Sequence, residues 1–345
     1  MIFYSGDGVS IRDSMKMMSY NYMRSHLYVM LKLARTLGIN KILDGFAGIT
    51  QEVVPGSDVY YSLKEFDEYK LETPTLSDYS NSIAVLFFAV VTKDTYHKIL
   101  KVVSSSPYFI YYNSDPELNN DYFGDGDKMF LKFIKDNPND PLSKLFRSRC
   151  ICIVTGFHFM LSQLSIFDKP TVYIPQIINP NYPRFHSEKF YDGWMINNSP
   201  AHKVIADRLS EEGIKLLVLT HNKDWVTSQD CIECNKSGLS LDILLSAVSM
   251  CKYYVGSYPL AEDNDDTMSK RYSTWNHTSK VLESYYANTY WISSNHNYRQ
   301  VLEILKSDQW TRQNDFNRYV EINYSFSTYK YQFNDLVDVC RQSIK

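Results

Sequence analysis

The chain has 345 residues, 44% of them hydrophobic, which is enough for two domains that each bury a core of their own. Its 36 basic and 39 acidic residues nearly balance, so the net charge does not point to nucleic acid and any such contact requires a local basic patch. No apolar run approaches the ~18 residues that a membrane span needs, so we expect no membrane partner.

The six cysteines are expected to be reduced thiols of a cytoplasmic protein, because residues 1–13 lack the basic and apolar regions of a signal peptide. Cys231 and Cys234 have the spacing of half a zinc site. No second pair follows at zinc-ribbon spacing, so we expect no metal centre there.

The N-terminal half alternates strand-like and helix-like segments, which is the pattern of a parallel sheet covered by helices. The expected strands are residues 1–4, 41–43, 82–92, 108–112, 150–155 and 171–175. The expected helices are residues 21–37, 95–103, 128–135 and 142–147.

A stretch rich in proline and asparagine, residues 176–183, has neither helical nor strand periodicity and is expected to be a linker. The alternation then resumes. The expected strands are residues 190–196, 214–220, 253–255 and 290–292, and the expected helices are residues 200–212, 239–249 and 277–287, with a helical tail from residue 298.

These patterns predict an α/β chain with two Rossmann-like domains that face a central cleft, where a ligand binds at the carboxyl ends of the strands. The expected boundaries are 1–178 for the N-terminal domain and 179–325 for the C-terminal domain. Residues 326–345 form a helical tail that can cross back to the N-terminal domain.

The most informative motif is the pair Lys280 and Glu283, which follows an acidic, hydroxyl-rich loop at residues 261–276. A carboxylate three residues after a lysine lies on the same helical face. That face can offer an acceptor for ribose hydroxyls and a cation for a diphosphate, although such pairs more often lie on solvated helix faces.

The order of the motifs resembles that of the GT-B glycosyltransferases, and most closely the phage DNA glucosyltransferases that act on 5-hydroxymethylcytosine. The segments that carry the resemblance are Tyr191-Asp192-Gly193, Gly213-Ile214-Lys215, Val255-Gly256-Ser257 and Lys280-Val281-Leu282-Glu283. The resemblance implies a glycosyltransferase that moves a sugar from a uridine diphosphate (UDP) donor, such as UDP-glucose, to hydroxymethylated pyrimidine in phage DNA. The enzyme would be a monomer in the cytoplasm of the infected host.

By the same resemblance, Gly193 lies against the donor diphosphate, and Lys280 and Glu283 bind the diphosphate and the ribose. The arginines that the family carries after the position of Gly193 are replaced here by residues 196–200. Phosphate binding would then fall to Lys280, to Lys270 and Arg271, and to backbone N–H groups near Ser199.

Asp115, in Tyr112-Asn113-Ser114-Asp115-Pro116, resembles the family's catalytic aspartate. The same residue types are also typical of a turn. His26 is an alternative base whose competing role is helix packing.

Four further residues are candidates for the acceptor site. Gly6 and Gly8 follow the first strand and would allow close approach of a substrate. Arg147 and Arg149 would bind DNA phosphates. Aspartates at residues 121–127 and 263–266 would allow a divalent ion, although solvated loops explain them as well.

Two rival functions are kept open. Residues 41–48, Lys-Ile-Leu-Asp-Gly-Phe-Ala-Gly, resemble the glycine-rich strand end of an S-adenosylmethionine-dependent DNA methyltransferase, with residues 179–182 as an imperfect copy of its catalytic loop. A non-catalytic binding protein with a degenerate glycosyltransferase fold would explain the missing arginines. Fold alone does not decide among these readings.

Overall fold

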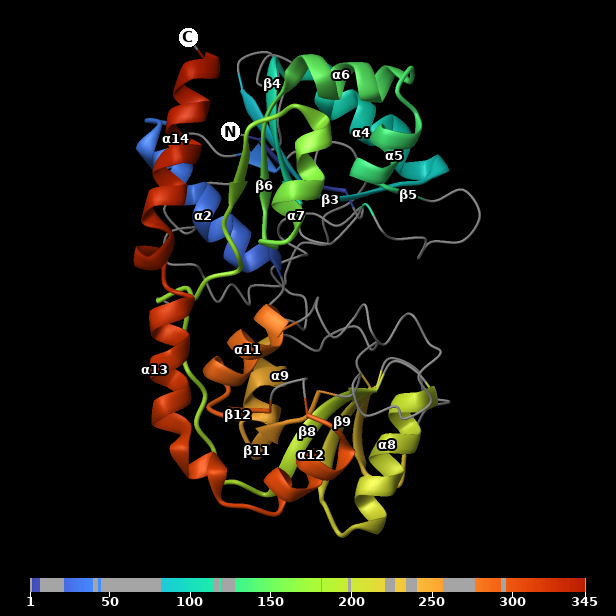
Figure 1. The fold of residues 1–345 in the computed structure, drawn as a ribbon, viewed down its shortest axis with the longest axis vertical. Coiled ribbons are helices and arrows are strands. Elements are labelled where there is room, and N and C mark those ends of the chain that lie inside the picture. The colour runs from blue at the N-terminus through green and yellow to red at the C-terminus, as the bar shows by residue number, and fades with distance from the viewer. Residues whose placement is uncertain are drawn as a thin grey trace, which may run out of the picture. The chain divides into compact units, whose positions relative to one another are not determined.

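The computed structural model describes residues 2–6, 22–39, 43–44, 82–113, 118, 128–180, 182–197, 200–220, 227–233, 241–256, 277–292 and 296–344. These residues divide into two compact units. Unit 1 takes the described residues up to Asn179 together with those from Phe326 onward, and unit 2 takes Pro180–Ser325. Each unit is a sheet flanked by helices (Figure 1).

The sheet of unit 1 has the order β2-β1-β3-β4-β6-β7 with all neighbours parallel, and β5 pairs with β3 in the antiparallel sense. Its strands are β1 (Ile2–Gly6), β2 (Leu43–Asp44), β3 (Ile83–Val91), β4 (Tyr108–Asn113), β5 (Lys128–Met129), β6 (Cys150–Thr155) and β7 (Thr171–Tyr173). Its helices are α2 (Tyr22–Thr36), α4 (Lys93–Ser105), α5 (Phe130–Asp136), α6 (Pro141–Arg149), α7 (Met160–Leu164) and α14 (Lys330–Ile344), with the 3₁₀ turns Ser165–Phe167 and Phe326–Tyr329.

Alternation along β4 gives unit 1 two cores, one on each face of the sheet. Ile110 and Tyr112 pack with α2 and with the C-terminal helix α14, which lies beside α2 (Figure 1). Phe109 and Tyr111 pack on the other face with residues of α4, α5 and α6.

Local sequence signals begin the helices of unit 1. Thr92 caps α4, because its side chain accepts the N–H groups of Asp94 and Thr95. The side chain of Thr95 in turn accepts the N–H of Thr92, which completes a capping box. Asp140 caps α6 directly before Pro141, whose missing N–H costs nothing in the first turn.

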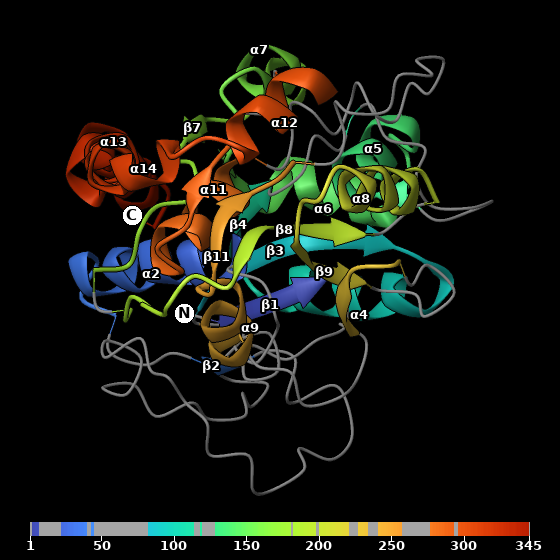
Figure 2. The same ribbon diagram turned by 90° about the horizontal axis from the view of Figure 1, so that it is seen from below.

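The sheet of unit 2 is parallel throughout, with the order β10-β9-β8-β11-β12. Its strands are β8 (Tyr191–Asn197), β9 (Leu216–Thr220), β10 (Asp230–Glu233), β11 (Cys251–Tyr254) and β12 (Tyr290–Trp291). Its helices are α8 (Pro200–Glu211), α9 (Leu241–Val248), α11 (His277–Tyr286), α12 (Tyr298–Leu305) and α13 (Gln313–Asn323), with the 3₁₀ turn Gln309–Arg312. Helices cover both faces of this sheet (Figure 2).

Numbered by their order in the chain, the strands of unit 2 run 3-2-1-4-5, which is the Rossmann order. Met195, Tyr253 and Val255 pack with α8 and α12 on one face. The predicted α/β class with two parallel sheets is confirmed. None of the described helices is long and apolar enough to cross a membrane.

Candidate functional site

The strand order places a ligand-binding edge in unit 2 at the carboxyl ends of β8 and β11. β8 lies between β9 and β11. The chain adds β9 and β10 on one side of β8 and then returns to add β11 and β12 on the other side. In open parallel sheets, ligands bind at this switch point, just beyond the carboxyl ends of the strands. Asn197 ends β8 and Tyr254 ends β11 at this edge.

Helix α11 brings Lys280 to the same edge. It follows β11 and leads into the parallel strand β12, so its first turn must lie at the carboxyl end of the sheet. Lys280 Nζ lies 2.6 Å from Glu283 Oε2, and the two side chains are 12% and 0% exposed. The predicted pair is therefore a buried ion pair and not a solvated one.

Aromatic side chains of β8 and β11 line the sheet beneath this pair. Lys280 Nζ lies 6.0 Å from the centre of the Trp194 ring. That ring lies 4.6 Å from the Tyr254 ring, and its Nε1–H donates to Thr289 Oγ1 at 3.4 Å. An ammonium between a buried carboxylate and an aromatic ring is held in one place, which suits it to bind a phosphate at the sheet edge.

His202 is a residue of this edge that the sequence analysis missed. It lies in the first turn of α8, directly after the carboxyl end of β8, and is 3% exposed. Burial lowers the pKa of its imidazole to about 4, so the ring is neutral at pH 7. The sequence around it, Pro200-Ala201-His202, gives no sign of this burial.

The placement of Gly193 requires a correction. The resemblance put it against the donor diphosphate, but Gly193 lies inside β8, which continues for four residues to Asn197, and it pairs with Tyr253 and Leu216 near the amino end. A Cβ there would lie 3.0 Å from Val255 Cγ2 and 3.3 Å from the carbonyl oxygen of Tyr253. Close packing explains this glycine, and nothing in its position favours contact with a diphosphate.

Gly193→Ala is expected to destabilise unit 2 by about 1–3 kcal/mol, because the added methyl overpacks the space between β9 and β11. Urea denaturation measures this change. Gly256→Ala is the control, since a Cβ there meets no described atom within 4 Å. If UDP binding, and not stability, fell in folded Gly193→Ala, the donor role of Gly193 would be restored.

The remaining predicted residues are distributed as follows. Gly6 ends β1. This strand lies between β2 and β3, at the switch point of the sheet of unit 1. His26 is in α2, with a side chain outside the described part of the structure. Five residues lie outside the described residues altogether: Gly8, Asp115, Ser199, Lys270 and Arg271.

Arg147 and Arg149 do not join Gly6 in one site. They end α6 directly before β6 begins, and therefore lie at the amino edge of the sheet, opposite the carboxyl end of β1. Arg149 Nη1 donates to the carbonyl oxygens of Val103 and Ser106 at 3.3 and 2.9 Å, and Arg147 Nη2 donates to that of Pro138. Arg149 thus satisfies the carbonyl end of α4, where a cation is favoured.

Arg149→Met is expected to lower the free energy of unfolding by about 1–2 kcal/mol, because carbonyls at the end of α4 lose a charged donor. Chemical denaturation checks this, with the exposed Lys144→Met of the same helix as the control. A loss of DNA affinity in the folded Arg149 variant, with unchanged stability, would contradict this structural role.

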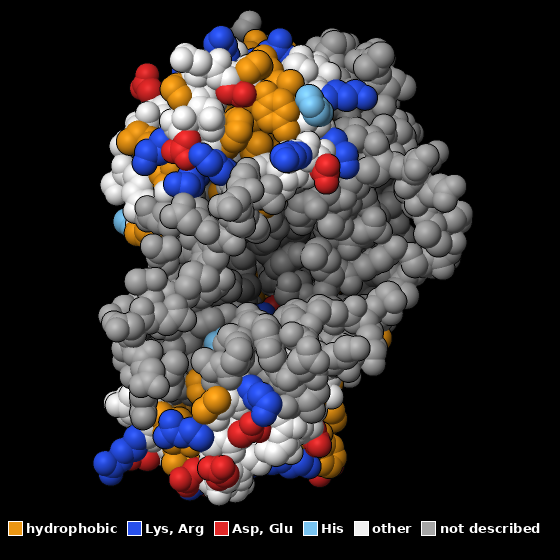
Figure 3. All heavy atoms as spheres, turned by 90° about the vertical axis from the view of Figure 1, so that its right-hand side faces the viewer, with side chains coloured by type: hydrophobic (Ala, Val, Ile, Leu, Met, Phe, Trp, Pro, Cys, Tyr) orange, Lys and Arg blue, Asp and Glu red, His pale blue; other side chains and the backbone are white. Residues whose placement is uncertain are grey.

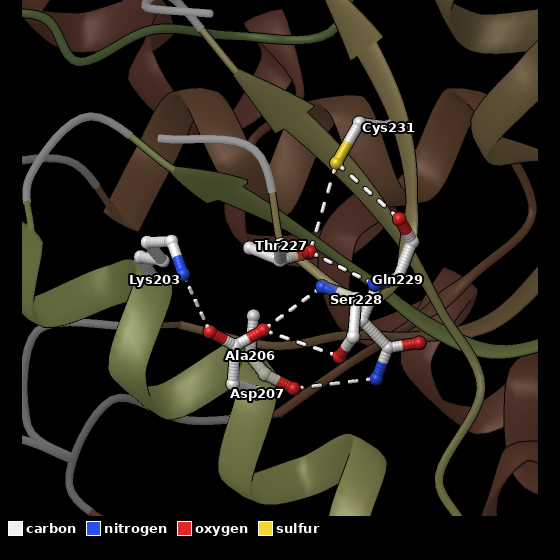
Figure 4. Close-up of polar contacts among 7 residues, drawn as sticks. All are labelled: Lys203, Ala206, Asp207, Thr227, Ser228, Gln229 and Cys231. Carbon is white, nitrogen blue, oxygen red and sulfur yellow. Dashed lines mark hydrogen bonds and ion pairs between the residues drawn. The ribbon is translucent and has the colours of Figure 1, made fainter. Parts of the chain in front are cut away.

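A second concave feature of unit 2 is an open hollow of about 680 Å³ beside the C-terminal half of α8. Asp207 accepts hydrogen bonds there from Ser228 N–H at 2.9 Å and from Lys203 Nζ at 2.9 Å (Figure 4). Partial burial raises the pKa of Asp207, but these donors more than offset it and leave the pKa below its ordinary value.

The side chain of Gln229 completes this network by donating to the carbonyl oxygen of Ala206 at 3.3 Å (Figure 4). It also donates to the carbonyl oxygen of Ile214 at 2.9 Å. These contacts tie the end of α8 to the segment that enters β10 at its amino end. The hollow therefore lies at the edge opposite Asn197, and its polar groups serve the local structure.

Charges on the described surface are mixed. Figure 3 shows lysine and arginine beside aspartate and glutamate on this face of each unit. Among the residues that the structure describes, no group of three or more His, Cys, Asp or Glu side chains could hold a metal ion. Cys231, from the weak zinc motif, lies in β10, and Cys234 is outside the described residues.

No protein-family model matches the chain. No curated protein sequence matches it either. Among solved structures, the chain is distantly similar to the pneumococcal O-GlcNAc transferase GtfA in complex with UDP and GlcNAc. The identity is 8% and the TM-score 0.37, and the match covers 76% of this chain but only 56% of GtfA. A likeness this distant assigns neither an activity nor a substrate.

Proposed function

We propose that the protein is a glycosyltransferase that takes its sugar from a UDP donor held by unit 2. The observation that carries this proposal is the buried Lys280–Glu283 pair, 2.6 Å apart, in the turn of α11 that opens at the carboxyl edge of a Rossmann-ordered sheet. Lys280 would bind the donor diphosphate, and Glu283 would accept hydrogen bonds from the ribose hydroxyls. Lys280 Nζ lies 6.0 Å from the centre of the Trp194 ring in the sheet.

Glycosyl transfer needs positive charge or N–H dipoles on the departing diphosphate and a base near the acceptor hydroxyl. In this proposal Lys280 supplies positive charge and the first turn of α8 supplies N–H dipoles, both at the carboxyl edge of the sheet of unit 2. Ser199 and Arg271 would add to these groups. We assign the base to Asp115, which follows the end of β4 by two residues in the sequence.

We further propose that unit 1 takes the acceptor and that the acceptor is hydroxymethylated pyrimidine in DNA. The support is the sequence resemblance to phage DNA glucosyltransferases together with a second switch point at β1 and β3, where Gly6 ends its strand. Arg147 and Arg149 are left out of this acceptor site, since their guanidinium groups bind backbone carbonyls at the opposite edge.

The methyltransferase alternative is less well supported by the geometry. Its glycine-rich residues 45–48 follow β2, which is the edge strand of its sheet and pairs only with β1 among the described strands. A cofactor at a switch point would instead contact the ends of β1 and β3. The alternative also gives no role to the Lys280–Glu283 pair.

The test is a transfer assay with UDP-glucose and UDP-N-acetylglucosamine as donors. Sugar incorporation is scored in DNA with and without 5-hydroxymethylcytosine, beside a thermal-shift measurement with UDP and with S-adenosylmethionine. We expect UDP to stabilise the protein and sugar to enter only the modified DNA. Stabilisation by S-adenosylmethionine, with no response to UDP and no transfer, would overturn the proposal in favour of the methyltransferase.

A further inference from the structure

One asparagine in unit 1 has a buried side chain whose hydrogen-bonding capacity is unused. Asn113, the last residue of β4, is 0% exposed, and neither its Nδ2 nor its Oδ1 has a hydrogen-bond partner within the described structure. Its main chain is engaged, since its carbonyl oxygen accepts the N–H of Gly156 at 3.2 Å. A buried carboxamide left in this state opposes folding, so we expect it to be satisfied by a bound water or by a ligand.

The location of Asn113 agrees with a ligand-binding function. β3, β4 and β6 are parallel neighbours, so the ends of β4 and β6 share the carboxyl edge of the sheet. Thr155 pairs with Asn113 across this edge and is also 0% exposed, but its Oγ1 accepts the N–H of Phe157 at 3.2 Å. Gln176, three residues beyond the end of β7 at the same edge, has a second buried carboxamide oxygen without a partner.

A carboxamide presents one acceptor beside two N–H donors, so its complement is a ligand edge that carries an acceptor next to a donor. Nucleobase edges have this arrangement, and asparagine binds such edges through two parallel hydrogen bonds. An acetamido group has it as well. A plain hexose has hydroxyl groups but no such planar edge.

We propose that Asn113 is the residue that recognises the acceptor, by pairing its carboxamide with an amide-like edge of the acceptor molecule. This inference rests on the proposed function, in which unit 1 takes the acceptor, and it assigns the selection of that acceptor to one side chain. Asn113 binds and orients the acceptor, while the proton of the reacting hydroxyl passes to another group.

The test is Asn113→Leu, which keeps the volume of the side chain and removes both unpaired atoms. The variant is expected to unfold at a higher temperature than the wild type, because it no longer buries an unsatisfied amide. The ligand probes are 5-hydroxymethyldeoxycytidine, N-acetylglucosamine and glucose. At least one of the first two should raise the wild-type melting temperature, with its affinity at least tenfold weaker in Asn113→Leu, and glucose should have no effect on either protein.

Asn137→Leu is the matched control, because Asn137 Nδ2 already donates to the carbonyl oxygen of Phe133 at 2.9 Å. It is expected to lower the melting temperature and to leave ligand binding unchanged. The inference is overturned if Asn113→Leu is also destabilised, if the two proteins bind the probes equally, or if neither amide-bearing probe binds the wild type. UDP binding is measured in parallel and should be equal in both proteins, so a failure of the donor proposal is seen separately.

Discussion

Glu283→Ala is expected to lower the free energy of unfolding by about 3 kcal/mol and to abolish detectable UDP binding. Glu283 is 0% exposed and lies 2.6 Å from Lys280 Nζ. Removing one partner of a buried pair leaves the other charge uncompensated, at a cost of about 3–5 kcal/mol. We expect the lower end, because Lys280 is 12% exposed and can turn toward water.

Two further variants separate charge from volume and from general surface effects. Glu283→Gln keeps the shape of the side chain, so it should retain more stability than Glu283→Ala but bind UDP at least tenfold more weakly. Glu303→Ala removes a glutamate from a pair whose side chains are 88% and 66% exposed, and should change neither property. Chemical denaturation and calorimetric titration with UDP give the two readouts. Normal UDP affinity in folded Glu283→Gln would remove Glu283 from the donor site.

The second large effect is an acid-induced loss of stability that originates at His202. Burial lowers the pKa of His202 to about 4 from an ordinary value of 6.5. Between these values the unfolded chain binds more protons than the folded chain, so the stability is complete above pH 6.5 and falls as the pH drops toward 4. A difference of this size corresponds to about 3 kcal/mol for the group.

His202→Gln is expected to remove the pH-dependent part of the stability that His202 contributes. The measured quantity is the difference in unfolding free energy between the variant and the wild type at each pH. The difference should change by about 3 kcal/mol between pH 7 and pH 4. His97→Gln, at an exposed position of α4, is the control and should follow the wild type. Parallel curves for His202→Gln and the wild type would mean that His202 is not buried as a neutral ring.

Most of the secondary structure could be predicted because the apolar pattern of each element is strong. β3, β4, β6 and β9 are short runs of buried side chains, which sequence periodicity detects well. β10 was missed, because Asp230-Cys231-Ile232-Glu233 has only one strongly apolar side chain and its cysteine invited a metal interpretation. The strand is formed by its pairing with β9, which is a tertiary effect.

The candidate site was only partly predictable, for a different reason. The spacing of Lys280 and Glu283 on one helical face is a local property, so the sequence could indicate that they meet. The donor role of Gly193 came from the resemblance alone, and its position inside β8, where Trp194 and Met195 continue the strand, does not favour that role. His202 and Asn113 are notable only because they are buried, and burial depends on the packing of distant segments.

The most direct test of the central claim is hydrogen exchange of the intact chain with and without UDP, followed by mass spectrometry. The account predicts slower exchange in peptides that cover the first turn of α11, around Lys280, and the first turn of α8, around His202, with none at the hollow around Asp207. Glu283→Gln should lose this protection. Unchanged exchange at α11 in saturating UDP, or protection confined to unit 1, would contradict a donor site at the carboxyl edge of the sheet of unit 2.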